Sequence, residues 1–356
     1  MAARLRILYV GPLWEGGTCL QRMNALIELG HCIKGIETEP PHVHRAQRHL
    51  WNRIAGKLFR MGLNAFGPRD LAGANRTILE QFRAERWDVL WLDKGLTIEA
   101  ATLQEVKGRN PDCRILGYSP DDMFARHNQS RQFLEHIRLC DVFFTTKSYG
   151  VRELESLGCP RVVFVGNAFD PHTHYPRAVS DQNRKRFGGP VGFIGQYEAE
   201  RASSMYHLTR AGIPVHVWGT NWEKCRYKQE NLILEHEALW ADDYAMAICA
   251  FDINLCFLRK ANRDLQTQRS IEIPACGAFM LAERTEEHLA LFEEGKEAEF
   301  FSLDEELLDK VRYYVAHEDA RRRIAAAARE RCLKSGYSNH DRLRKVLEYL
   351  QSKKRF

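Results

Sequence analysis

The chain has 356 residues, of which 44% are hydrophobic and 28% are charged, as is usual for soluble globular proteins. This length exceeds one ordinary hydrophobic core and predicts two domains of roughly 150–200 residues each. The net charge of +5 suits anionic small ligands or an acidic membrane surface, and it is too small to indicate a protein that binds nucleic acid.

The cysteines and the N-terminus indicate a reducing compartment. The ten cysteines occur singly, without a CxxC pair, which favours reduced and buried thiols. The opening "MAARLRILYVGPLW" runs from a short apolar stretch into a turn and lacks a signal-peptide cleavage site. No stretch approaches the roughly 18 apolar residues that span a bilayer. We therefore expect a cytoplasmic protein, either free or peripheral at the inner face of the membrane.

Strand and helix patterns alternate along the first half of the chain. The apolar run "LRILYVG" (Leu5–Gly11) predicts a buried parallel strand, and the helical pattern that follows ends at Gly30. Further strands are predicted at 87–93, 113–119, 141–147 and 161–168, with helices at 98–110, 130–140 and 149–158. Alternation of this kind predicts an α/β fold with a doubly wound parallel sheet.

A second α/β series follows a change in composition. Residues 169–190 contain three prolines, few apolar residues and clustered basic ones, which favours a linker. We expect an N-terminal domain at 1–170, a linker at 171–189, and a C-terminal domain at 190–338 with its own Rossmann-like sheet. A last helix at 339–356 is expected to pack back on the N-terminal domain. Two such domains place ligands in a cleft at the carboxyl ends of their strands.

The first strand-to-helix turn, "VGPLWEGGT", lacks the GxGxxG pattern of dinucleotide-binding proteins, and the sequence has no GxxxxGK[ST] motif. Gly17 and Thr18 still precede a helix, whose free N–H groups attract anions. They are candidate residues of a donor site, and an ordinary tight turn with a threonine cap is the alternative.

Strand ends of the second domain carry stronger candidates. "FIGQYEAER" contains Gly195 and Gln196 after a strand and Arg201 at the start of a helix, where a guanidinium group suits a diphosphate. "HVWGTNW" ends the next strand with Gly219 and Asn221. Both turns are expected to face the cleft.

The stretch "NRDLQTQRSIEIPACGAF" (262–279) combines charges with a buried pattern, which is costly unless the charges are paired or meet a charged ligand. Carboxylates accept from ribose or sugar hydroxyls, and arginines neutralise phosphate. Its candidate donor-binding residues are Asn262, Arg263, Asp264, Thr267, Arg269, Ser270 and Glu272. A salt-bridged structural corner is the alternative. Pro274 predicts a short or kinked helix, ended by Gly277.

The run from "DDYAMAICAFDINLCFLRKANRD" through "RSIEIPACGAFMLAERTEEHLALFEEGKEAEFFSLDEELLDKVRYYVAHEDARRRIA" resembles the C-terminal domain of group-1 glycosyltransferases of the CgeB-like, spore-maturation-protein type. The resemblance spans about 90 residues, and the earlier stretches "VGFIGQYEAER" and "ILYVGPLWEGGT" resemble the same group more loosely. It implies the GT-B fold: two facing Rossmann-like domains, of which the C-terminal one holds a nucleotide-sugar donor and the N-terminal one the acceptor.

The resemblance also assigns roles. In the related family-4 retaining transferases a Glu-x7-Glu pair contacts the donor. Glu272 matches the second position, which is expected to hold the ribose hydroxyls, whereas Asp264 replaces the first glutamate with a shorter carboxylate. Arg201 matches a diphosphate-binding base. We expect a UDP-sugar as donor and a glycan, glycolipid or small molecule as acceptor. We expect no metal and no further cofactor. The likeness to family 4 implies that the configuration of the transferred sugar is retained.

Acceptor-side candidates come from the N-terminal domain. "GYSPDDMFARHNQ" follows a strand, so Asp121, Asp122 and His127 are candidate catalytic residues that act as a base or orient the acceptor hydroxyl. A helix cap is the alternative for Asp121 and Asp122. Residues 44–69 mix basic and apolar side chains at helical spacing, which fits either an amphipathic helix on an anionic membrane or, more commonly, an ordinary surface helix.

Two other functions keep the same fold. A sugar-nucleotide epimerase or hydrolase would turn over the donor without an acceptor, and a non-catalytic protein would bind the nucleotide sugar only. The sequence favours the transferase.

Overall fold

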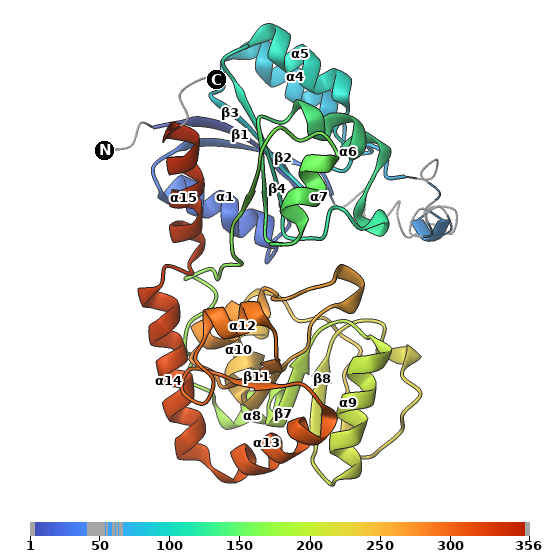
Figure 1. Cartoon of the computed structure of the whole chain (residues 1–356), viewed down its shortest axis with the longest axis vertical. Helices are drawn as coiled ribbons and strands as arrows, with labels where there is room; N and C mark the ends of the chain where they lie inside the picture. Colours follow the sequence, from blue (N-terminus) through green and yellow to red (C-terminus); the bar gives the residue numbers. More distant parts are fainter. Residues whose placement is uncertain are drawn as a thin grey trace. The chain divides into compact units, whose positions relative to one another are not determined.

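The computed structural model describes residues 4–40, 54, 56–58, 61, 63 and 67–352. The chain divides into an N-terminal unit, which holds residues up to Gly166 together with His340–Phe356, and a C-terminal unit, Asn167–Asn339. Each unit contains one six-stranded parallel sheet with helices on both faces (Figure 1). The α/β class with two doubly wound sheets, predicted from the sequence, is confirmed.

The sheet of the N-terminal unit has the order β2-β1-β3-β4-β5-β6. Its elements in chain order are β1 (Arg6–Gly11), α1 (Thr18–Glu28), β2 (Cys32–Glu37), α4 (Ala74–Ala84), β3 (Val89–Asp93), α5 (Ala100–Arg109), β4 (Arg114–Ser119), η2 (Arg126–Asn128), α6 (Arg131–His136), η3 (Ile137–Leu139), β5 (Val142–Thr145), α7 (Gly150–Ser156), β6 (Val162–Phe164) and α15 (Asn339–Ser352).

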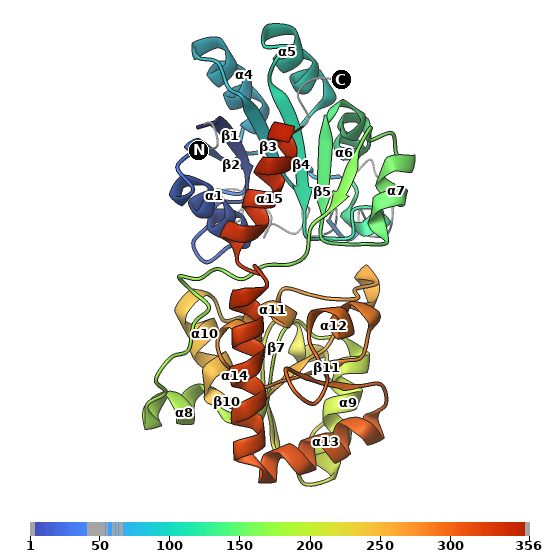
Figure 2. The same ribbon diagram turned by 60° about the vertical axis from the view of Figure 1, so that its left-hand side comes forward.

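Alternating side chains of the first strand feed two separate cores. Ile7 and Tyr9 pack with α1 and α15, whereas Leu8 and Val10 pack with α4, α5 and α6. This is the period-two pattern of a strand buried on both faces. The C-terminal helix α15 lies across this sheet (Figure 2), and Arg114 Nη1 donates a hydrogen bond of 2.7 Å to the Leu350 carbonyl.

The sheet of the C-terminal unit has the order β12-β11-β10-β7-β8-β9. Its elements are α8 (Asp181–Phe187), β7 (Gly189–Ile194), α9 (Ala199–Arg210), β8 (Val215–Trp218), η4 (Trp222–Lys224), β9 (Leu232–Leu234), α10 (Ala241–Ala250), β10 (Phe251–Cys256), η5 (Lys260–Asn262), α11 (Arg269–Ala275), β11 (Met280–Glu283), α12 (Glu286–Leu291), β12 (Glu299–Phe301), α13 (Asp304–Ala316) and α14 (Glu318–Lys334).

The helices α9 and α13 cover one face of this second sheet, and α8, α10, α11 and α14 cover the other. Residues 171–189, for which the sequence predicts a linker, lie in the C-terminal unit and include α8, whose Phe187 is buried against Trp218. The basic residues of this stretch occupy the exposed side of that short helix, which explains the polar composition. α11 has seven residues, contains Pro274 and is followed by Gly277 with a φ of 69°, as the sequence predicts.

Candidate functional site

The strand order of the C-terminal sheet indicates where a ligand would bind. β7 and β10 are neighbours at its centre, but the helix after β7 covers one face and the helix after β10 covers the other. In open parallel sheets ligands bind at this switch point, outside the carboxyl ends of the two strands. Gly195 and Gln196 follow β7, and Phe257 and Leu258 follow β10.

Two arginines meet at this switch point. The Arg201 side chain is 4% exposed and donates from Nη1 to the Gln196 carbonyl (2.9 Å) and from Nη2 to the Leu258 carbonyl (2.8 Å). Arg201 thereby joins the loop after β7 to the loop after β10. Arg269, the first residue of α11, donates from Nη2 to the Phe257 carbonyl (3.2 Å). Both guanidinium groups are thus fixed by backbone carbonyls.

Both guanidinium groups also lie against the Phe193 ring, with their central carbons 5.6 and 5.5 Å from the ring centre. Burial and, next, the charge of Arg269 lower the pKa of Arg201 to about 10. Glu198 lies 3.5 Å from Arg201 and offsets one charge. Nε of each arginine is buried and has no hydrogen-bond partner among the described residues. Hydrogen-bond donors without a partner and a local excess of positive charge are features of an anion-binding site.

Glycines keep the backbone of this edge tightly packed. A Cβ on Gly219, whose φ is 153°, would lie 1.9 Å from the Gly195 carbonyl oxygen, and a Cβ on Gly195 would lie 2.6 Å from the Phe193 ring. The loop after β8 can approach the loop after β7 only because Gly219 lacks a side chain, and Gly195 leaves room for the Phe193 ring. Asn221 follows in the left-handed region (φ 66°), and its Oδ1 accepts a hydrogen bond of 3.1 Å from Lys224.

Glu272 is a buried carboxylate in the first turn of α11. It is 6% exposed, and its Oε2 accepts a hydrogen bond of 2.5 Å from the Tyr244 hydroxyl on α10. Burial and the charge of Glu272 raise the pKa of Tyr244, so the phenol keeps the proton that it donates. The other oxygen, Oε1, lies 3.7 Å from His174 Nε2, while His174 Nδ1 accepts from the Asp170 N–H. These contacts hold the carboxylate in one orientation.

The end of η5 and the loop that follows it carry three of the predicted residues. Asn262 is 4% exposed, Arg263 is exposed in the left-handed region (φ 51°), and the Asp264 N–H donates 3.2 Å to the Arg259 carbonyl. Asp264 therefore sits in a tight turn, whereas Glu272 sits within the helix and has Tyr244 and His174 as its neighbours.

Thr267 and Ser270 begin α11 and are joined to each other. The Ser270 hydroxyl is fully buried; it accepts from the Thr267 N–H (3.0 Å) and lies 2.7 Å from His288 Nε2. His288 Nδ1 lies 2.6 Å from the Glu283 carbonyl, so Nδ1 donates and Nε2 accepts from Ser270. This chain of bonds shapes the start of the helix, which is a structural role.

In the N-terminal unit, Gly17 and Thr18 begin α1. Gly17 has an extended backbone, its N–H donates 3.0 Å to the Trp14 carbonyl, and a Cβ there would lie 3.0 Å from that oxygen. Thr18 is the first residue of the helix rather than its cap, which is Gly17. The threonine cap left open by the sequence is therefore not formed.

The acceptor-side candidates separate into different roles. Lys94 Nζ, after β3, forms a 2.7 Å ion pair with Asp121 Oδ2, after β4, so both lie at the carboxyl edge of the first sheet. Asp122 is 1% exposed, and its Oδ1 accepts from the N–H groups of Phe124 and Ala125 (3.1 and 3.2 Å). These bonds cap a turn, whereas the alternative that the sequence left open was a helix cap; the cap of the following η2 is Ala125.

His127 lies in the short η2 turn that follows Asp122 and is partly exposed. A buried cluster that no sequence motif predicts lies beneath this edge. Arg22, on α1, contacts Asp93 Oδ2 through Nε (2.8 Å) and Nη2 (2.7 Å), and the Tyr9 hydroxyl donates to the same oxygen (2.5 Å). Asp93 and Arg22 are 1% and 2% exposed.

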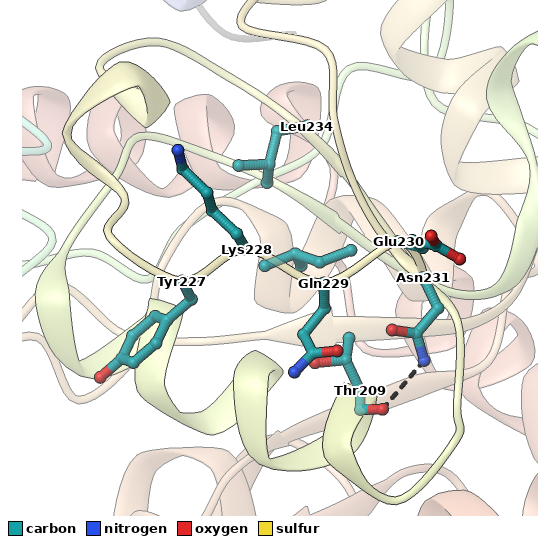
Figure 3. Close-up of a pocket in the computed structure, with 8 residues that line it drawn as sticks. Thr209, Tyr227, Lys228, Gln229, Glu230, Asn231 and Leu234 are labelled. Atoms are coloured by element: carbon teal, nitrogen blue, oxygen red, sulfur yellow. Dashed lines mark hydrogen bonds between the residues drawn. The ribbon is translucent and has the colours of Figure 1, made fainter.

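A surface hollow of about 920 Å³ lies elsewhere in the C-terminal unit. It is lined by Thr209, Tyr227, Lys228, Gln229, Glu230, Asn231, Leu232 and Leu234. Figure 3 shows the Asn231 amide, which bonds the Thr209 carbonyl at 2.9 Å. Asn231 precedes β9, so the hollow is at the amino edge of the sheet and contains no predicted site residue.

Most of the segment 44–69, considered above as a membrane-surface helix, lies outside the described residues. Among the helices that are described, none has the length and apolar character needed to cross a membrane.

Comparison with known proteins was made on sequence and on structure. Residues 201–348 match a family model described as glycosyl transferase-like, and this stretch begins at Arg201 and includes Arg269 and Glu272. A comparison with curated protein sequences gives no match.

Solved structures match over nearly the whole chain. HepE of Anabaena, in complex with UDP and glucose, is 11% identical, with 98% of this chain and 100% of that chain covered and a TM-score of 0.61. A glycosyltransferase of Rickettsia africae is 12% identical, with 98% of each chain covered and a TM-score of 0.62.

A sucrose-phosphate synthase of Thermosynechococcus elongatus is 10% identical, covers 97% of this chain and 98% of that chain, and has a TM-score of 0.61. At such identities the likeness shows the fold. The chain therefore carries a glycosyl transferase-like domain, and its two Rossmann-like units have the GT-B fold of the glycosyltransferases that it resembles.

Proposed function

We propose that the protein transfers a sugar from a nucleotide-diphosphate sugar, a UDP-sugar in particular, to an acceptor hydroxyl. The observation that carries this proposal is the pair Arg201 and Arg269, a buried and a partly buried guanidinium group held on one ring at the switch point of the C-terminal sheet. Their buried Nε–H groups, which have no partner among the described residues, and the positive charge that Glu198 leaves unpaired match the diphosphate of such a donor. No metal is needed in this scheme, because the arginines supply the positive charge.

The proposed positions of the ribose and the base follow from that of the diphosphate. Glu272 lies one turn further along α11 than Arg269 and offers a carboxylate to the ribose hydroxyls. Its fixed orientation suits two neighbouring hydroxyls, each of which donates to a carboxylate oxygen. The uridine base is supported by the Anabaena HepE complexes with UDP and with UDP-glucose, whose fold this chain shares.

The chemical step requires a stabilised leaving group. When the bond between the sugar and the diphosphate breaks, negative charge grows on the diphosphate, and fixed donors such as Arg201 and Arg269 stabilise it without rearrangement. Retention of configuration is part of the proposal because the motif that contains Glu272 resembles that of retaining enzymes.

The acceptor is assigned to the N-terminal unit. Asp121, held by Lys94 at the carboxyl edge of the first sheet, is the proposed group that accepts a hydrogen bond from the acceptor hydroxyl. Asp122 is left out of this role because its carboxylate caps a turn. A glycan, a glycolipid or a small molecule with a free hydroxyl is the proposed class of acceptor.

Calorimetric titration with UDP, GDP, CDP and ADP tests this function. UDP is expected to bind most tightly, and Glu272→Ala is expected to weaken it about 10-fold to 100-fold, the cost of losing hydrogen bonds to a charged group. The control is Glu318→Ala, an exposed glutamate at the start of α14. If no diphosphate binds, or if Glu272→Ala binds UDP as well as the parent, the donor site is wrongly assigned.

A further inference from the structure

Trp240 is a large aromatic side chain that the site described so far does not use. It is 56% exposed and is the N-cap residue of α10. It ends the connection from β9 to α10, so it lies at the carboxyl edge of the sheet, the edge that carries Arg201 and Arg269. An exposed tryptophan at a ligand-binding edge is a candidate contact, since burying it against a flat apolar surface is favourable.

The backbone next to Trp240 is held in a costly conformation. Ala241 has a φ of 46° and His236, at the other end of the connection, has a φ of 54°. Residues other than glycine rarely adopt such values, which are strained and cluster at ligand-binding places. The connection that ends at Trp240 therefore contains strained backbone at both of its ends.

The first turn of α10 links Trp240 to the proposed ribose site. The Tyr244 N–H donates 3.3 Å to the Trp240 carbonyl, so the two residues are separated by one helical turn, about 6 Å along the axis. Residues four apart lie on the same side of a helix. The Tyr244 hydroxyl in turn bonds Glu272. Trp240 is therefore one turn beyond the residue that holds the proposed ribose ligand.

We propose that the indole of Trp240 stacks on the nucleobase of the donor. This inference rests on the proposed function, because it takes Glu272 as the ribose site. A nucleobase is attached directly to its ribose on the side away from the diphosphate. The order Arg269, Glu272, Tyr244, Trp240 follows the order diphosphate, ribose, base. Stacking adds affinity for any flat base, so the choice of uracil must come from other groups.

The test compares ligands with and without a base. Wild type, Trp240→Ala and Trp240→Phe are titrated with UDP and with inorganic pyrophosphate. Loss of a base–aromatic stack weakens UDP between about 5-fold and about 150-fold in Trp240→Ala. Pyrophosphate binding is expected to stay within twofold, and Trp240→Phe is expected to keep most of the UDP affinity.

Tyr313→Ala is the matched control. Tyr313 is 50% exposed and lies in the third turn of α13, a helix that leads away from the carboxyl edge. Its removal is expected to change neither affinity. Each variant is also checked for an unchanged melting temperature.

The outcomes separate the two proposals. Equal UDP affinity of wild type and Trp240→Ala overturns the stacking role and leaves the donor site in place. A parallel loss of pyrophosphate and UDP binding in Trp240→Ala also overturns it, because the residue then acts on the diphosphate or on the fold. If the wild type binds neither UDP nor pyrophosphate, the proposed function fails and the stacking role fails with it.

Discussion

Arg201 and Arg269 carry the same charge and yet place their guanidinium groups against the same ring, that of Phe193. Arg201 is buried and Arg269 is partly buried, so desolvation and mutual repulsion both oppose this arrangement unless an anion joins the two cations. Burial and the nearby charge of Arg269 both disfavour the charged form of Arg201, and its pKa is therefore lowered. The diphosphate of the proposed donor would supply an anion to this pair.

The acceptor side gives a prediction that separates transfer from donor binding. In Asp121→Asn the acceptor hydroxyl loses its negatively charged partner, and a misplaced nucleophile typically costs about 100-fold in rate. We expect incorporation of radiolabelled glucose from UDP-glucose into a glycan and glycolipid preparation to fall by that factor, with UDP affinity unchanged. Asp112→Asn, in the exposed turn before β4 at the opposite edge of the sheet, is the control. Full incorporation by Asp121→Asn would exclude the assigned role.

Two buried histidines predict a loss of stability in mild acid. Burial lowers the pKa of His288 and of His136 to about 4, although each also bonds a backbone carbonyl. Both are neutral in the folded protein and take up protons on unfolding below about pH 6.5. Stability is therefore full above pH 6.5 and falls as the pH drops toward 4, by about 3 kcal/mol for each group.

His288→Gln removes one of these titrations while keeping polar atoms next to Ser270. Urea unfolding between pH 7.5 and pH 4.5 is expected to show a shallower loss of stability for this variant than for the wild type. An identical pH slope in the two proteins would mean that His288 is protonated in the fold.

A network of charges at the end of the second sheet predicts a further effect of acid. Lys310 Nζ contacts Glu294 Oε1 (2.7 Å) and Glu299 Oε2 (2.6 Å), and Arg284 contacts Glu294 and Glu306. Burial raises the pKa of Glu294, but hydrogen bonds from Arg284 and Lys310 outweigh it and lower the pKa below 4.5.

A lowered carboxyl pKa stabilises the fold above pH 4.5, and this contribution disappears as the pH falls through the folded value. Lys310→Met leaves the glutamates without their shared cation, and we expect it to lose about 1–3 kcal/mol at pH 7. The loss should shrink as the pH falls through the lowered pKa of Glu294, because a protonated carboxyl no longer needs the cation. A pH-independent loss would point to packing alone.

The buried pair in the N-terminal unit allows a double-mutant test. Arg22→Met leaves Asp93 charged and without its main partner, which typically costs about 3–5 kcal/mol. Asp93→Leu is expected to be similarly costly, because it leaves Arg22 unpaired. The double variant should lose less than the sum, since two apolar side chains replace two charges. Additive losses in chemical unfolding would show that the two side chains are not coupled.

Several strands and helices can be predicted from the sequence because they depend on local patterns of residues. The apolar runs of β1, β7 and β10 are long enough to be recognised, and Pro274 with Gly277 limits α11. The sequence does not predict β9 (Leu232–Leu234) and β12 (Glu299–Phe301), because strands of three residues carry no periodicity. Their place in the sheet depends on pairing with residues distant in the sequence.

The same distinction applies to the site. Arg201, Arg269 and Glu272 were each chosen from the residues around them, but their partners lie far away in sequence. Tyr244 and His174 next to Glu272, and Phe193 beneath the arginines, have no local signal of function. Asp93 likewise ends an ordinary apolar strand, and only the fold brings Arg22 to it. Long-range pairing of this kind cannot be obtained from one sequence.

The most direct measurement is the affinity for UDP of wild type, Arg269→Met and the control Arg184→Met, determined by calorimetry. Arg184 is a half-exposed arginine of α8, paired with Asp252, and its removal changes the net charge equally. A diphosphate held by the arginine pair predicts a loss of at least about 10-fold in Arg269→Met, the scale of a charge-assisted hydrogen bond, and none in Arg184→Met. Equal UDP affinity in all three proteins would contradict the assignment of the donor site.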